Sequence, residues 1–206
     1  MTIGVTHTAS ADVAFAQPSA AAVASDVVLL AQVAGGDRLA MRNLYLRHER
    51  RVFRFVLRML GDRGLAEDVL SEVFFEVWKK AEQFQGRSSV STWLLGICRH
   101  KALTAANRRP TESIDSETAM NIVDPANTPE AELSQKDTGS VIRRCLAALS
   151  PEHAEMIDLV YYQEKSIKEI VEILGIPENT VKTRMFYARK RLAALVAAEG
   201  IDRAAA

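Results

Sequence analysis

The stretch from Ser166 to Leu192, SIKEIVEILGIPENTVKTRMFYARKRL, decides the fold class of this chain. Apolar residues recur every three or four positions on both sides of Gly175 and Pro177, which is the pattern of two amphipathic helices. Gly175 can take the left-handed backbone that ends a helix, and Pro177 cannot continue the first helix but can begin the next. The stretch therefore predicts a helix-turn-helix.

The same spacing predicts which sides of the two helices are buried. We expect the core side to hold Ile167, Ile170, Val171, Leu174, Ile176, Val181, Met185, Ala188 and Leu192. The second helix carries one acid, Glu178, against a basic set made of Lys182, Arg184, Arg189, Lys190 and Arg191. A helix-turn-helix of this kind lays its second helix in the DNA major groove. The alternative interpretation is a solvated basic face on a helical bundle.

The chain as a whole is neutral, with 26 basic and 26 acidic residues in 206. Part of the balancing acid lies between Pro110 and Asp137, where three prolines and seven acids accompany one lysine. This composition predicts a flexible acidic linker over 111–137. Residues 1–24, rich in Ala, Ser, Thr and Val, predict a disordered tail. The predicted domains are the two remaining segments, 25–110 and 138–206. Both are more basic than the net charge of the whole chain suggests.

Both predicted domains have helical periodicity, and no convincing period-two strand is present, so the predicted fold class is all-α. The clearest helix carries an apolar stripe made of Ala66, Val69, Leu70, Val73, Phe74, Val77, Trp78 and Ala81. A helix that ends at Gly61 precedes it, and a polar loop at 85–91 leads into a helix with Leu94, Leu95, Ile97, Cys98 and Leu103 for its core. In the second domain, Ser150 and Pro151 predict the start of another helix.

Several classes of function are disfavoured by composition and spacing. No apolar run reaches the length of about 20 residues that spans a bilayer, and no secretory signal is evident. Cys98 and Cys145 lie far apart and predict reduced thiols in a cytoplasmic protein. The histidines lack metal-ligand spacing, and no nucleophile–base set or phosphate loop is present. We therefore expect no metal, no cofactor and no enzymatic activity.

The stretch 166–192 resembles region 4 of bacterial sigma factors of the extracytoplasmic-function (ECF) group. The segment AEDVLSEVFFEVWKKAEQFQGRSSVSTWLLGICRHKALTAANRR, which begins at Ala66, resembles region 2 of the same group. The resemblance covers roughly 37–109 and 139–195, in the family's order. It implies a promoter-specificity subunit that binds core RNA polymerase, at the β′ clamp and the β flap, together with promoter DNA. It also implies control by an anti-sigma factor and a monomer when free.

Site residues are carried over from the family position by position. Contact with the −35 promoter element is implied for Asn179, Thr180, Lys182, Thr183, Arg184, Phe186 and Tyr187. Docking on the polymerase clamp is implied for Asp68, Ser71, Glu72 and Trp78, although Ser71 stands where many relatives have Gln. Capture of a flipped −10 base, or contact with nearby phosphates, is implied for Ser88, Ser89, Ser91, Trp93, Arg99, Lys101, Asn107, Arg108 and Arg109.

Alternatives stay open for the aromatic residues and for the protein. Phe186, Trp78 and Trp93 could each be core side chains instead of contacts. The whole chain could be an ordinary helix-turn-helix regulator that binds DNA without polymerase, usually as a dimer. It could also be a sigma mimic that sequesters an anti-sigma factor, although the receiver domain of such proteins would need βα alternation, which is missing here.

Overall fold

The computed structural model describes residues 25–108 and 132–200, and within these ranges every regular element is a helix. The predicted all-α class is therefore confirmed. The predicted tail, the linker up to residue 131 and the site residue Arg109 lie outside the described residues. No helix within the described ranges is both long enough and apolar enough to cross a membrane.

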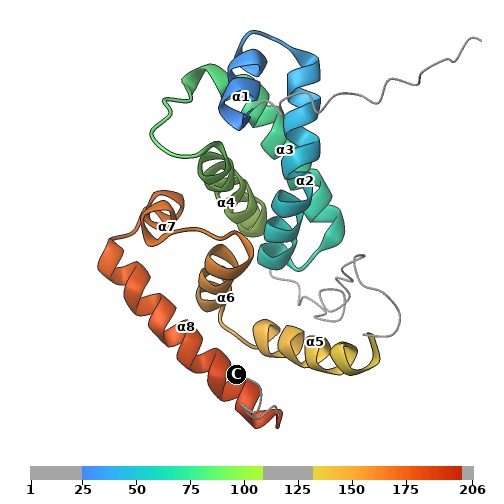
Figure 1. Ribbon diagram of the computed structural model, residues 1–206, viewed down its shortest axis with the longest axis vertical. Coiled ribbons are helices and arrows are strands. Elements are labelled where there is room, and N and C mark those ends of the chain that lie inside the picture. Colours follow the sequence, from blue (N-terminus) through green and yellow to red (C-terminus); the bar gives the residue numbers. More distant parts are fainter. Residues whose placement is uncertain (1–24, 109–131, 201–206) are drawn as a thin grey trace, which may run out of the picture.

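The first four helices form the upper half of the molecule in Figure 1. They are α1 (Asp26–Ala34), α2 (Arg38–Leu60), α3 (Arg63–Lys80) and α4 (Val90–Arg108), with a short 3-10 turn, η1 (Ala81–Gln83), after α3. Local signals set their ends. The Asp37 carboxylate accepts hydrogen bonds from two backbone N–H groups at the start of α2. Gly61, at φ 65°, ends α2 in the left-handed conformation, as its sequence position predicts.

The predicted apolar stripe of α3 is largely buried against α2 and α4. Its fully buried members are Ala66, Val69, Val73, Phe74, Val77 and Ala81. Trp78 departs from the stripe because 36% of its surface is exposed, and Leu103 on α4 is likewise 40% exposed. The apolar stripe predicted for α3 is therefore wider than the face of α3 that the neighbouring helices cover. Phe55, which the sequence analysis did not single out, is 1% exposed and anchors α2.

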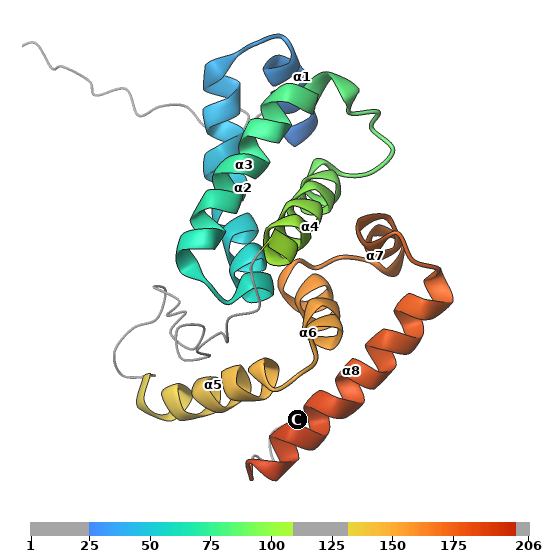
Figure 2. The same ribbon diagram turned by 180° about the vertical axis from the view of Figure 1, so that it is seen from behind.

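The second half contains α5 (Glu132–Ala147), α6 (Pro151–Ile157), a π-helical turn η3 (Asp158–Tyr162), α7 (Ile167–Leu174) and α8 (Glu178–Ala198). Helix α5 begins at Glu132, inside the stretch that the sequence predicts as linker. Ser150 caps α6, whose first turn contains Pro151, as predicted. Helix α8 packs along α6 and α5, on the side away from the first four helices (Figure 2).

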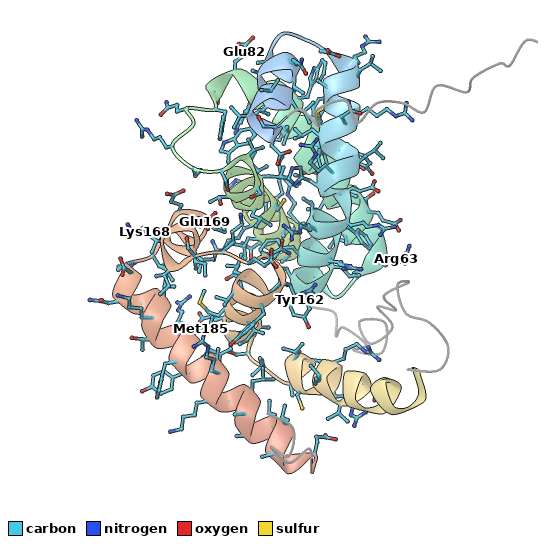
Figure 3. The ribbon with its side chains drawn as sticks, in the orientation of Figure 1. Arg63, Glu82, Tyr162, Lys168, Glu169 and Met185 are labelled. Carbon is cyan, nitrogen blue, oxygen red and sulfur yellow. The ribbon has the colours of Figure 1, made fainter. Side chains whose placement is uncertain are left out.

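Helices α7 and α8 form the predicted helix-turn-helix, with Gly175 at φ 66° between them. The buried side holds Ile170, Leu174, Val181 and Ala188, as the spacing predicts, and Met185 lies on the side of α8 that faces α6 (Figure 3). The prediction for Ile167 is wrong, since it is 40% exposed in the first turn of α7. Ile173 is buried although it was not predicted to be. The buried stripe of α7 begins at Ile170, about one helical turn later than the sequence suggests.

The two halves meet where α7 lies beside α4 in both views (Figures 1 and 2). Buried apolar side chains of both halves belong to one contiguous cluster. Beside it lies Asp158, a carboxylate that is 2% exposed and pairs with Arg58 of α2. One of its oxygens has no hydrogen-bond partner. Burial raises the pKa of Asp158 from 3.8 to about 6, because desolvation outweighs the attraction of the Arg58 guanidinium.

Replacing the Asp158 carboxyl should change how stability depends on pH. The folded carboxyl binds its proton more tightly than the unfolded one, so acidification from about pH 7 to about pH 5 stabilises the fold through this group, by about 1 kcal/mol. In Asp158→Asn this contribution is absent. The free energy of unfolding is measured with denaturant at both pH values. Its change on acidification should be about 1 kcal/mol less favourable in the variant than in the parent protein. His48, whose pKa burial lowers, affects both proteins alike. Equal pH dependence of the two proteins would contradict the assignment.

Candidate nucleic-acid interface

The start of α8 gathers most of the polar residues predicted to meet the −35 element. Asn179, Lys182 and Thr183 are exposed, whereas Thr180 and Arg184 are half-buried. The N-cap residue of α8 is Pro177, whose side chain cannot accept a hydrogen bond. The first backbone N–H groups of α8 are therefore not capped by that side chain. The positive end of the helix dipole and the basic side chains thus favour the same kind of ligand, an anion.

Three of these polar groups already have partners within the domain. Lys182 pairs with Glu178 at 2.7 Å, and Arg184 lies 3.7 Å from Glu152 of α6. The Thr183 hydroxyl donates to the Asn179 carbonyl at 2.8 Å, which leaves its oxygen as an acceptor. The Lys182 pair is exposed on both sides, and exposed pairs are weak and readily screened. A phosphate can therefore displace Glu178 at small cost.

The aromatic pair on α8 is exposed. Phe186 is 63% exposed and Tyr187 is 53% exposed, with their rings edge-to-face at 5.4 Å. The alternative that Phe186 is a core side chain is therefore wrong. The guanidinium of Arg189 lies 5.7 Å from the ring centre of Tyr161, a neighbouring aromatic on η3. Together these residues extend the basic surface of α8 with flat apolar groups, which suit contact with bases or sugars.

The serine loop before α4 is both a cap and a surface. The Ser89 hydroxyl accepts from the backbone N–H of Thr92 at 3.2 Å, and it also lies 3.1 Å from the Ser91 hydroxyl. Ser88 and Trp93 line a cavity of about 390 Å³ between α3, α4 and α7. That volume falls within the roughly 300–1,000 Å³ of typical small-ligand sites. The space beside the loop therefore has the volume of a small-ligand site.

Trp93 packs as an anchor of α4, which is one of the two interpretations that the sequence left open, and its −10 role stays a prediction. Its ring is half-buried and packs edge-to-face on Phe84 with centroids 5.4 Å apart, which anchors the start of α4. The same side chain forms part of the cavity wall. A base that entered the cavity would meet an aromatic group whose position is already fixed by packing.

The remaining residues predicted for the −10 element are spread along α4 instead of forming one cluster. Arg99 faces the second domain and pairs with Glu155 at 2.8 Å. Lys101 faces α3 and lies 3.5 Å from both Glu72 and Glu76. Asn107 and Arg108 are exposed at the far end of the helix, about 25 Å along its axis from the loop. They cannot contact a base held at the loop, although they can reach a neighbouring stretch of backbone.

The outer face of α3 carries the residues predicted to dock on polymerase. Asp68, Ser71, Glu72 and Trp78 are all exposed, in agreement with a surface role. Between them lies Phe75, which is 59% exposed and has the Lys79 ammonium 4.3 Å from its ring centre. Phe75 is not among the residues predicted from the sequence. Its position one step off the buried stripe, beside Ser71 and Glu72 at helical spacing, was the available signal.

Sequence comparison places both halves in one family. The family model described as Sigma-70 region 2 matches residues 44–110, and the model described as Sigma-70, region 4 matches residues 140–192. Among curated relatives, the ECF RNA polymerase sigma factor SigK of Mycobacterium tuberculosis (strain H37Rv) is 32% identical over 168 residues, covering 76% of this chain and 86% of SigK. The ECF sigma factor SigL of M. tuberculosis (strain Erdman) is 29% identical over 171 residues, covering 82% and 96%.

Two solved structures have a similar fold. CnrH, in complex with the cytosolic domain of CnrY, gives a TM-score of 0.62 at 21% identity, covering 84% of this chain and 97% of CnrH. The sigma factor RpoE of Bartonella quintana, in complex with the anti-sigma factor NepR, gives 0.59 at 22% identity, covering 79% and 98%. Neither matched family model describes a catalytic domain. The chain belongs to the sigma-70 family of RNA polymerase sigma factors, within its ECF group.

Proposed function

We propose that this sigma factor binds core RNA polymerase and directs it to promoters whose −35 element is contacted by α8 and whose −10 element is received at the serine loop. The observation that carries the proposal is the pairing of two separate surfaces. One is the exposed polar and aromatic start of α8, and the other is the loop and cavity beside Trp93. They lie in the two domains that match the two sigma regions.

The outer face of α3 is the proposed polymerase-docking face, defined by Asp68, Ser71, Glu72, Phe75 and Trp78. It combines two carboxylates with two exposed aromatic rings, a composition that favours a protein partner over DNA. A cytoplasmic, monomeric protein follows from this role. In both similar structures the matched protein is bound to a partner, CnrH to the cytosolic domain of CnrY and the sigma factor RpoE to the anti-sigma factor NepR. We infer that an anti-sigma factor controls this chain as well.

Transcription in vitro across a promoter library is the direct test. Core polymerase with the purified chain should start transcription at a subset of promoters that core polymerase alone does not use. The free chain should bind duplex DNA weakly, because the polymerase contributes most of the affinity. Tight duplex binding by the free chain, with no effect on core polymerase, would support an ordinary helix-turn-helix regulator instead.

Truncating Phe75 should separate polymerase binding from stability. Phe75→Ala removes an exposed ring, so the free energy of unfolding should change by less than about 0.5 kcal/mol. If the ring fills a pocket on the polymerase, its loss should weaken core binding by about 2 kcal/mol, roughly thirtyfold. Leu46→Ala, at a residue that is 56% exposed on α2, is the control and should leave core binding unchanged. Equal affinity of the Phe75 variant and the control for core polymerase would remove α3 from the docking face.

Neutralising Lys182 should reduce the salt dependence of promoter binding. A lysine that contacts a phosphate releases one counterion, so the slope of log binding constant against log salt for the holoenzyme should fall by about 1 in Lys182→Ala. Lys190→Ala removes the same charge from an exposed site on the same helix, outside the predicted contact set. We expect the control to keep the original slope. Matching slopes for the two variants would mean that Lys182 makes no phosphate contact and acts only through the overall electrostatic field of the domain.

A further inference from the structure

The cavity between α3, α4 and α7 has a feature that the fold itself does not require. Gly96 lies in the interior of α4, where glycine is less favourable than any residue except proline. Its backbone is helical, so no left-handed conformation calls for glycine. A Cβ atom at this position would meet no atom within 4 Å beyond its own stretch of helix, so close packing does not call for glycine either. The missing side chain instead leaves open space on the cavity wall.

The wall around Gly96 suits a flat ring. Trp93 lies about one turn before Gly96, is half-buried and is held by edge-to-face packing on Phe84. Ile97 follows Gly96 and lines the same cavity. A residue without a side chain lets a ligand approach the helix backbone closely, and an aromatic neighbour favours stacked or edge-to-face contact with a second ring. This part of the cavity therefore fits a planar aromatic or heterocyclic group.

The other end of the cavity carries three basic side chains. Lys80, at the end of α3, and His100 and Lys101 of α4 all contribute to the wall, and we call them the basic end. Lys80 lies 2.7 Å from Glu76, whereas Lys101 lies 3.5 Å from both Glu76 and Glu72, which is longer than most hydrogen bonds. Each ammonium has three N–H donors, so both lysines retain donors for a further anion.

The third wall of the cavity comes from region 4. Glu172 of α7 is exposed there, and within the part of the chain that the structure describes its carboxylate forms no ion pair. Helix α7 lies beside α4 in Figure 1. A carboxylate only accepts hydrogen bonds, so it selects a ligand with N–H or O–H groups. Because His100 comes seven residues after Trp93, the basic end lies about 10 Å from that ring along α4. These groups are spread over the length of a substituted ring and are not gathered around one ion.

We propose that this cavity binds a free nucleoside monophosphate, whose base lies against Trp93 and Gly96 and whose phosphate lies at the basic end. The base supplies the planar ring, together with N–H groups that donate to the Glu172 carboxylate. The phosphate supplies an oxyanion, which ammonium groups bind as point charges. Neither half alone satisfies the site. Bare phosphate leaves the apolar wall uncovered, and a bare base leaves the two lysines without an added anion.

A nucleotide in this cavity competes with promoter DNA. Ser88, Trp93 and Lys101 belong to the set predicted for the −10 element, and each also lines the cavity. The same side chains cannot contact a DNA strand and a free nucleotide at once. This consequence rests on the proposed function, whereas binding of the nucleotide does not. The free nucleotide is thereby a small-molecule antagonist of promoter binding.

The test measures binding of AMP, GMP, CMP and UMP to the full chain by isothermal titration calorimetry. Gly96→Leu fills the cavity from its wall. Gly64→Leu is the matched control, because it makes the same change in α3, outside the cavity, where a Cβ atom meets only the Asp62 carboxylate at 3.5 Å. Leucine favours a helix more than glycine does, so neither variant should unfold more readily than the parent in denaturant. Loss of binding can then be assigned to the filled space.

At least one of the four nucleotides should bind the parent chain with a dissociation constant below about 1 mM. Gly96→Leu should weaken that binding by about tenfold or more, and Gly64→Leu should leave it unchanged. A parent chain that binds none of the four nucleotides would overturn the proposal. Equal affinity of the two variants for the nucleotide would do the same.

Two further ligands test the two assigned ends. Inorganic phosphate and the corresponding nucleoside should each bind about tenfold or more weakly than the nucleotide. Phosphate that binds as tightly as the nucleotide would contradict the ring contact, and a nucleoside that does so would contradict the phosphate contact.

Promoter binding by the holoenzyme, measured without transcription substrates, should weaken as the nucleotide is added. A promoter affinity that the nucleotide does not change would contradict the competition. Failure of the proposed function is recognised separately, because the chain with core polymerase would then start no promoter-dependent transcription while the free chain still binds the nucleotide.

Discussion

The arrangement of the two domains depends on the carboxylate of Glu169, which takes part in two structures at once. One oxygen accepts from the backbone N–H of Ser166 at 3.0 Å and completes the capping box that starts α7. The other accepts from Thr92 of α4 at 2.7 Å. Hydrogen bonds from Thr92 and Ser166, with the Lys165 charge, overcome the opposing effect of burial and lower the pKa of Glu169 to about 2. The start of the helix-turn-helix and the docking of region 4 on region 2 therefore share one charged group.

The neutrality of the chain acquires a structural meaning from this interface. Part of the balancing acid lies in the predicted linker, where acidic residues favour solubility. Within the described residues, other acids lie directly opposite arginines of the partner domain, as in Arg99 with Glu155. Opposite charges separated along the chain are thus brought together by folding. Because a buried charge without a partner is costly, the largely buried Arg58 and Arg99, which α2 and α4 turn toward region 4, each require an oxyanion partner.

Local signals in the sequence predicted several helix ends, whereas the start of α5 and the way the helices cover one another could not be read from it. Ser150, Pro151 and Gly175 act through backbone geometry within a few residues, so their effects could be predicted from position alone. Ile167 was expected in the core but is exposed, and Trp78 is exposed although it lies on the apolar stripe, because periodicity locates such a stripe without giving its width. The residues proposed to contact the −35 element were assigned by resemblance and stay a prediction. The contacts of Lys165 with Ser91 and Thr92 could not, since they join positions more than 70 residues apart.

The three proposed surfaces differ in how exposed they are when the two domains are packed together. The docking face on α3 is open, with Phe75 59% exposed, and so is the aromatic pair on α8. The serine loop alone among the three is held by the other domain. Under the proposed function, polymerase can therefore engage α3 without any rearrangement of the two domains, whereas hydroxyls of the loop already contact Lys165 and Glu169.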